Sequence, residues 1–169
     1  MGEVAPPSPL VSAVAKLVYS TIMSLDGYTT DASGNIAWGA PDDEVFTCIN
    51  ELERGIGTHL YGRKMYETMV YWETFDAPVG QSSTERAFDP GAVLRIKETT
   101  GHDISVGGPD LAGQAIAAGL VDEMHLFLNP VTVGSGTVTL PDHFDITPEL
   151  LGVDRFMSGV VHLHYHLGR

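Results

Sequence analysis

Three short stretches of this sequence place glycine, alone or beside charged residues, at positions that suit ligand binding. They are Asp26-Gly27, Gly62-Arg63-Lys64 and Gly107-Gly108. The last one follows a β-branched, strand-like run and precedes an alanine-rich segment with helical spacing, which begins at Pro109. A helix that starts after glycine leaves its first N–H groups open to an anion, which the helix dipole also favours. Gly107-Gly108 is therefore a candidate phosphate-binding turn for a nucleotide cofactor, and the alternative is a tight turn that needs glycine for its geometry alone.

Composition limits the partners of this chain. With nine Lys and Arg against 22 Asp and Glu, the formal charge is -13, which repels polyanions and argues against nucleic acid as a partner. No apolar run approaches the roughly 20 residues that span a bilayer, so no membrane segment is predicted. The single cysteine, Cys48, cannot form an internal disulfide, and no secretory signal pattern is present. We therefore expect a cytoplasmic protein that binds small molecules.

Predicted strands and helices alternate along the chain and would position these stretches. Strands are predicted at 16–23, 57–61, 104–106, 122–130 and 131–133; helices at 41–54, 65–70, 91–99 and from 109 to Gly119; and a terminal hairpin at 150–155 and 159–166. Residues 28–40 are expected to form a long binding loop that carries Trp38. We expect residues 1–15 to be a loose arm and 16–169 to form one α/β domain, with a largely parallel sheet closed by an antiparallel pair.

Three histidines in the last predicted strand raise the question of a metal site. His162, His164 and His166 alternate with apolar residues, so they share one face of the strand about 7 Å apart. A His-x-His pair can chelate a metal. An amphipathic strand with a polar outer face explains the same pattern, and no supporting ligand stands out, so no metal is predicted.

Taken in order, these motifs resemble the dihydrofolate reductase-like family, and within it the reductase domain of riboflavin biosynthesis (the RibD C-terminal domain) with its stand-alone bacterial relatives. The chain lacks the glycine patterns of Rossmann folds and P-loops. The matching stretches are Tyr19–Gly27, Trp38–Asp43, Leu60–Glu67, Val106–Gly108, Ala118–Glu123, Pro130–Gly136 and the terminal hairpin. The resemblance implies a three-layer α/β domain with a mostly parallel central sheet and a C-terminal antiparallel hairpin.

The resemblance also implies a function, that of an NADPH-dependent reductase. Such an enzyme transfers hydride to a C=N or C=O carbon of a small heterocyclic or carbonyl substrate, and relatives are often homodimers. A carboxylate after a Trp-x-x-Pro motif anchors the substrate and supports its protonation in the family, and Asp43 matches it. In an apolar cleft, desolvation would raise the pKa of such an acid; the alternative is that acids simply suit the first turn of a helix. The substrate-binding residues so implied are Asp26, Trp38, Asp43 and Phe46.

The same resemblance assigns the cofactor to the glycine turns and to the end of the first strand. In the family the Gly-Gly peptide bond is typically cis. A solvated, basic helix start is the alternative interpretation of Arg63-Lys64. The loop at 28–40 is expected to act as a lid. The cofactor-binding residues so implied are Ile22, Ser24, Gly62, Arg63, Lys64, Gly107, Gly108, Pro109, Asp110 and Leu111.

Three features depart from the family pattern. The family usually has threonine where Met65 stands, and Asp110 would place a negative charge near the expected phosphate. Only residues 74–90 connect the segment that ends at Glu73 to the helix at 91–99. This connection is about 30 residues shorter than in the family and too short for a crossover that contains a strand and a helix. One strand and one helix are therefore expected to be missing after Glu73. These departures support an alternative function, in which the fold has lost the dinucleotide and acts as a small-molecule binding protein or a redox-neutral biosynthetic enzyme.

Overall fold

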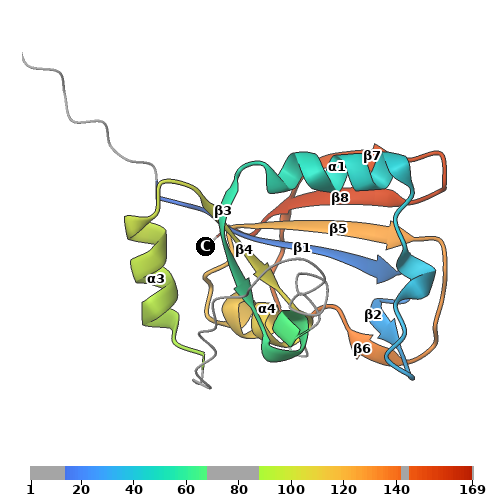
Figure 1. Ribbon diagram of the computed structural model, residues 1–169, viewed down its shortest axis with the longest axis horizontal. Coiled ribbons are helices and arrows are strands. Elements are labelled where there is room, and N and C mark those ends of the chain that lie inside the picture. The colour runs from blue at the N-terminus through green and yellow to red at the C-terminus, as the bar shows by residue number, and fades with distance from the viewer. Residues whose placement is uncertain (1–13, 68–87, 142–144, 169) are drawn as a thin grey trace, which may run out of the picture.

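A six-stranded sheet runs through the middle of the computed structural model, which describes residues 14–67, 88–141 and 145–168 (Figure 1). In spatial order its strands are β3 (Ile56–Tyr61), β4 (Asp103–Gly107), β1 (Leu17–Ser24), β5 (Glu123–Asn129), β8 (Val161–His166) and β7 (Glu149–Arg155). The first four strands are parallel, whereas β8 and β7 are antiparallel to their neighbours. The predicted mostly parallel sheet with a C-terminal antiparallel hairpin is confirmed.

The helices begin where the sequence provides N-terminal caps. They are α1 (Asp43–Glu53), α3 (Pro90–Thr99) and α4 (Pro109–Ala117), with a further helical start at residues 63–67. The Asp42 carboxylate accepts a hydrogen bond from the Val45 N–H at 2.9 Å, and Asp89 does the same for Gly91. Pro109 opens α4, and Gly119 follows it with a φ of +65°. The predicted boundaries of α1, α3 and α4 therefore agree with the structure to within a few residues, and the end of the helix predicted at 65–70 lies outside the described residues.

The two faces of the sheet carry separate apolar clusters. α1 lies on one side, and α4 lies on the other (Figure 1). The larger cluster includes Tyr19, Ile104 and Met124 and packs against the alanines of α4, whereas the smaller one joins Val45 of α1 to Phe127 of β5. Because the central strands β1 and β5 are covered on both faces, they read as nearly continuous apolar runs in the sequence.

Two expectations about the loops are wrong. The stretch predicted as one long loop at 28–40 contains the strand β2 (Tyr28–Asp31) and a short 3₁₀ helix, η1 (Ala37–Gly39). β2 pairs with β6 (Gly136–Val138), so a strand begins at Gly136, although Gly134-Ser135-Gly136 reads as a turn in the sequence. Residues 131–133, predicted as a strand, form none, because the carbonyl of Val131 and the N–H of Val133 bond to the loop after β1 instead.

Part of the sequence lies outside the described residues. This holds for most of the expected N-terminal arm, for most of the segment at 75–90, and for the place after Glu73 where a strand and a helix are expected to be missing. β3 stands at one edge of the sheet in the described part of the chain. Within that part, no helix is both long and apolar enough to cross a membrane.

Candidate functional site

The two glycine turns meet at the carboxyl ends of β3 and β4. The Gly62 N–H donates a hydrogen bond to the Gly107 carbonyl oxygen at 3.2 Å. A Cβ added to Gly108 would lie 4.0 Å from the Gly62 nitrogen and 3.6 Å from the Met65 Cβ. Turns that are 45 residues apart in the sequence, from 62 to 107, therefore form one surface without side chains of their own. Open α/β sheets bind ligands at this edge.

The Gly107-Gly108 turn differs in one respect from the expectation. Because no peptide bond among the described residues is cis, this bond is trans, and the expected cis linkage is wrong. The chain turns instead through Gly108, whose φ of +89° is a conformation that glycine adopts at little cost. Gly107 cannot carry a side chain either, since a Cβ there would lie 2.9 Å from the Tyr61 Cδ1 atom.

Two helix N-termini start at this surface, and both suit an anion. α4 follows Gly108, which has no side chain to cap it, and the other helical segment begins at Arg63 directly after Gly62. Arg63 and Lys64 are exposed, so an added phosphate could reach both cations. Asp110 is also exposed in the first turn of α4, where its charge already interacts with the helix dipole. Pro109 and Leu111 complete the predicted set, and the Leu111 Cβ lies 3.5 Å from the place of a Gly62 Cβ.

Ser24 and Asp26, after β1, bond to the protein itself. Ser24 is fully buried, and its hydroxyl accepts the Tyr28 N–H at 3.0 Å. The carboxylate of Asp26 accepts the N–H groups of Val133 and Gly134 at 2.7–3.2 Å. Hydrogen bonds, that of the Ser24 hydroxyl first, lower the pKa of Asp26. The structure therefore gives both residues a role in joining two loops, and their predicted contacts with cofactor and substrate stay predictions.

Ile22 marks where the loop at 28–40 crosses β1. A Cβ on Gly39 would lie 3.0 Å from the Cγ2 atom of Ile22, so the loop packs directly onto this strand. The loop is also bonded internally: Asp31 accepts the N–H groups of Ser33 and Asn35, and the Trp38 indole donates to the Asn35 carbonyl at 3.0 Å. The stretch that we expected to act as a lid is thus a folded unit.

Asp43 lies in the first turn of α1, and its side chain is exposed. The expected burial of this acid in an apolar cleft is therefore wrong for the described structure, because neighbouring side chains leave it open to solvent. Negative charge at the start of a helix is favourable there in any case, as the alternative interpretation holds. The cap of α1 is the neighbouring Asp42, a role that the sequence analysis did not assign.

Exposed apolar side chains accompany Asp43 at this end of the sheet. Phe46 is 56% exposed in α1, Leu25 is 63% exposed after β1, and Ile36 is 59% exposed ahead of η1. Leu25 and Ile36 were not among the predicted site residues, although apolar residues inside polar loops are a signal that could have identified them. Such side chains gain free energy when a ligand covers them.

The comparisons with known proteins bear on the fold and the family resemblance. Residues 84–162 match the family model described as the RibD C-terminal domain. The match spans slightly less than half of the chain, and over these residues the chain is similar to that family. The uncharacterized protein YyaP of Bacillus subtilis is 26% identical over 181 residues, which cover 89% of this chain and 94% of that protein.

Two solved structures extend the likeness to the whole fold. A putative riboflavin biosynthesis protein from Shewanella sp. PV-4 has a TM-score of 0.72 at 17% identity, covering 91% of this chain and 99% of that one. Dihydrofolate reductase from Enterococcus faecalis, solved with NADP(H), has a TM-score of 0.55 at 14% identity, with 91% and 97% covered. The dihydrofolate reductase-like fold predicted from the sequence is confirmed.

Proposed function

We propose that this protein is an NADPH-dependent reductase that acts on a C=N or C=O bond of a small heterocyclic or carbonyl substrate. One observation carries the proposal: the Gly62 and Gly107-Gly108 turns meet through a hydrogen bond of 3.2 Å, with two helix N-termini beside them. A phosphate needs close approach to backbone N–H groups, and glycine permits it. The family and the NADP(H)-bound relative support the choice of cofactor.

The residues present fit such a cofactor. Gly107 is buried against the Tyr61 ring, whereas Gly108 is half-buried and needs its positive φ, so a ligand would approach the turn at Gly108. Arg63 and Lys64 supply positive charge for the phosphates in a chain that is otherwise strongly acidic. When bound, NADPH supplies the hydride with its two electrons. The chain binds the phosphates, orients the ring by Ile22 near the end of β1, and covers the ring with loop 28–40.

A proton must accompany the hydride, because reduction of C=N or C=O adds one hydrogen to carbon and one to nitrogen or oxygen. Asp43 holds that proton in our proposal and donates it to the substrate nitrogen or oxygen. Phe46, Leu25 and Ile36 provide the apolar surface that substrate and cofactor cover together, which removes water from the carboxyl group. Exposure of Asp43 in the protein without ligands is compatible with this role, since catalytic groups often become ordered only in the complex.

A second candidate function rests on Asp110. Its exposed carboxylate stands in the first turn of α4, where a phosphate would otherwise bind. If that charge excludes the dinucleotide, the protein is a binding protein or a redox-neutral enzyme of the same fold. NADPH titration of the original chain and of Asp110→Asn separates the two functions. If the cofactor binds here, both proteins should bind NADPH and the variant modestly more tightly; under the second function the original chain should not bind it, and only the variant should gain binding.

Titration with NADPH tests the proposal directly. Tryptophan fluorescence reports binding, because Trp38 lies in the loop that would cover the nicotinamide. We expect saturable quenching and energy transfer to the reduced nicotinamide, with NADH as a weaker competitor. Lack of binding at millimolar NADPH would remove the reductase and leave the second candidate function.

We also propose that the chain forms a homodimer in the cytoplasm. β7 is an edge strand among the described residues, and its side chains Leu150, Leu151 and Val153 are about half exposed. Burial of these side chains against a second copy would stabilise the dimer. Light scattering on the full chain and on a Leu151→Lys variant checks this expectation, because the variant should be monomeric.

A further inference from the structure

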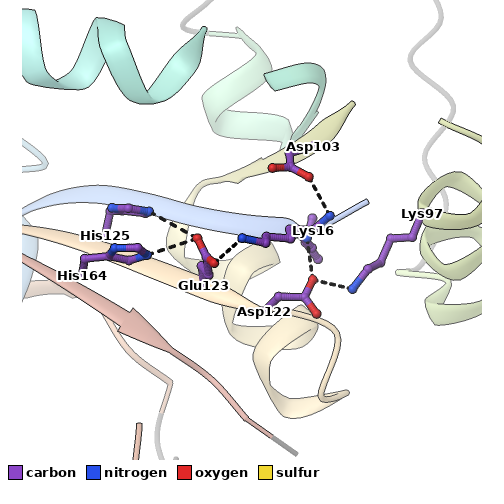
Figure 2. Close-up of polar contacts among 8 residues, drawn as sticks. Lys16, Lys97, Asp103, Asp122, Glu123, His125 and His164 are labelled. Carbon is purple, nitrogen blue, oxygen red and sulfur yellow. Dashed lines mark hydrogen bonds and ion pairs between the residues drawn. The ribbon is translucent and has the colours of Figure 1, made fainter. Parts of the chain in front are cut away.

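A group of histidines and one glutamate lies at the other end of the sheet from the glycine turns. Figure 2 shows the Glu123 carboxylate of β5 facing the imidazoles of His125 and His164. One ligand atom from each of these three residues lies within 4.8 Å of the other two. The side chains of Glu123 and His125 are 14% and 5% exposed, and that of His164 is 26% exposed. This cluster is therefore nearly enclosed, with one opening at His164.

A chain of hydrogen bonds orients His125 within the cluster. Asp154 lies 3.0 Å from Nδ1 of His162, and Nε2 of His162 lies 2.9 Å from Nδ1 of His125. A carboxylate only accepts, so we assign the Nδ1 proton of His162 to this bond. Nε2 of a neutral His162 then accepts from His125 Nδ1–H, which leaves a lone pair on Nε2 of His125.

That lone pair faces another acceptor. Nε2 of His125 lies 4.0 Å from Oε2 of Glu123, and Nε2 of His164 lies 3.1 Å from the same oxygen. Two acceptors turned toward each other in a nearly dry site repel unless a cation or a proton lies between them. The ring stacking of His125 on His164, with centroids 4.0 Å apart, keeps both rings beside the carboxylate.

We propose that Glu123, His125 and His164 bind a divalent metal ion of the zinc class. Zinc takes imidazole nitrogen and carboxylate oxygen at about 2.0–2.2 Å, which puts tetrahedral ligand atoms roughly 3.3 Å apart. The separations in the cluster bracket this value, so small rotations of the half-buried His164 suffice. His162 and Asp154 provide the hydrogen-bonded support behind a ligating histidine that such sites usually have.

Lys16 competes with the metal for the carboxylate. Its ammonium lies 2.6 Å from Oε1 of Glu123, so it occupies one oxygen and leaves Oε2 to the metal (Figure 2). The Lys16 side chain is 52% exposed and can move away from an incoming cation. Removal of its charge should therefore tighten metal binding, because a nearby positive charge opposes a second one.

The proposed site is independent of the reductase function. Glu123 begins β5, whereas Gly62 and Gly107 lie at the ends of β3 and β4, and all three strands belong to the parallel part of the sheet. The metal would thus join β5 to β8 at the edge away from the candidate cofactor site. We assign it a structural role, in which it fixes the pairing of these two strands.

Calorimetric titration of the metal-free full chain with Zn²⁺ tests this inference, and Co²⁺ serves as a spectroscopic probe. We expect one site, visible absorption bands of tetrahedral Co²⁺, and a higher melting temperature with metal. His164→Gln should lower the affinity more than 10-fold, as should Glu123→Gln. Asp154→Ala, at a side chain that is 64% exposed, should weaken binding about 10-fold through His162 without endangering the fold. Lys16→Gln should strengthen binding.

His166→Gln is the matched control, since His166 lies on the same strand but outside the cluster. It should leave both the affinity and the Co²⁺ spectrum unchanged. Circular dichroism of each variant without metal establishes that it is folded. The inference is overturned if the folded His164→Gln protein binds Zn²⁺ as tightly as the original chain, or if His166→Gln loses as much affinity.

Discussion

The N–H of Gly62 donates to the carbonyl of Gly107, so the ends of β3 and β4 stay together beyond the last paired residues of the two strands. This bond aligns two helix N-termini that start at Arg63 and at Pro109. A ligand that binds one turn is therefore placed beside the other.

Gly107→Ala should weaken both the fold and the cofactor site. The added Cβ would lie 2.9 and 3.1 Å from two carbons of the Tyr61 ring, so the ring or the turn must shift. Overpacking of this kind typically lowers the free energy of unfolding by about 1–3 kcal/mol. Urea denaturation measures the loss, and NADPH titration measures the effect on the turn. Gly101→Ala is the control, because a Cβ there meets nothing within 4 Å.

Arg63→Ala and Lys64→Ala should each weaken NADPH binding about 10-fold or more, since hydrogen bonds to charged groups contribute about 1.5–3 kcal/mol. The loss should shrink at high salt, which screens exposed charges. Fluorescence titration at two ionic strengths checks both points. Arg54→Ala removes an exposed cation of α1 that pairs with Glu51, and it should have no effect. If Arg54→Ala weakens NADPH binding as much as Arg63→Ala does, the effect comes from the net charge of the protein and not from a phosphate contact.

Asp43→Asn should separate catalysis from cofactor binding. If Asp43 provides the proton, the variant should lower kcat by about 10²–10⁴-fold. NADPH affinity should not change, because the phosphates bind elsewhere. The assay follows NADPH oxidation with a panel of small C=N and C=O compounds. Glu51→Gln, farther along the same helix, is the matched control. If the variant retains full turnover, Asp43 is not the proton donor, and its charge only stabilises the first turn of α1.

In the metal-free protein, acid should lower stability through His125. Burial first, then the charges of His164 and His162, lowers the pKa of His125 from 6.5 to about 4. Below pH 6.5 the unfolded chain takes up a proton that the folded chain refuses, so the free energy of unfolding falls as the pH drops toward 4. The loss can reach roughly 3 kcal/mol at 1.36 kcal/mol per unit of pKa. Urea denaturation from pH 8 downward, about four units in all, measures this slope. His125→Gln should flatten it, and an equal slope in that variant would assign the effect to other groups.

Lys97→Ala should cost far more stability than Arg95→Ala. The Lys97 side chain is 8% exposed, and its ammonium contacts the Asp122 carboxylate at 2.5 Å (Figure 2). The ammonium also donates to the Leu120 carbonyl at 3.1 Å. Its removal leaves these acceptors without their cation, a loss of about 2–4 kcal/mol for a mostly buried pair. Arg95 pairs with Asp89 in solvent, at 68% and 59% exposure, and should contribute less than about 1 kcal/mol. Thermal and urea unfolding of both variants would show similar losses if burial did not matter.

Local patterns in the sequence predicted the scaffold well. Ile104 and Val106 predicted a strand by their branching, and Gly108-Pro109 predicted the start of α4, because these signals depend on a few adjacent residues. The meeting of the glycine turns also followed, since parallel strands end at the same edge of a sheet. The fold was thus available from the sequence, including the C-terminal hairpin.

Such local patterns could not predict contacts between segments that are far apart in the sequence. The bond from Asp26 to the amides at 133 and 134 spans more than 100 residues, and nothing near Asp26 predicts it. The strands β2 and β6 are short, and their residues carry no alternation to reveal them. His162 was expected on a polar outer face, but it is 4% exposed and stacks on His125. Alternation tells which residues share a face of a strand, and it does not tell what covers that face.

The carboxylate of Asp26 ties together two turns at the carboxyl ends of β1 and β5. It belongs to the turn after β1, yet it holds the amides at 133 and 134 from the turn after β5. β2 and β6 then continue from these two turns and pair with each other. The two turns are therefore coupled, so a ligand that displaces one turn also moves the other. Loss of the Asp26 carboxylate would therefore loosen the turn after β1 and the turn after β5 together.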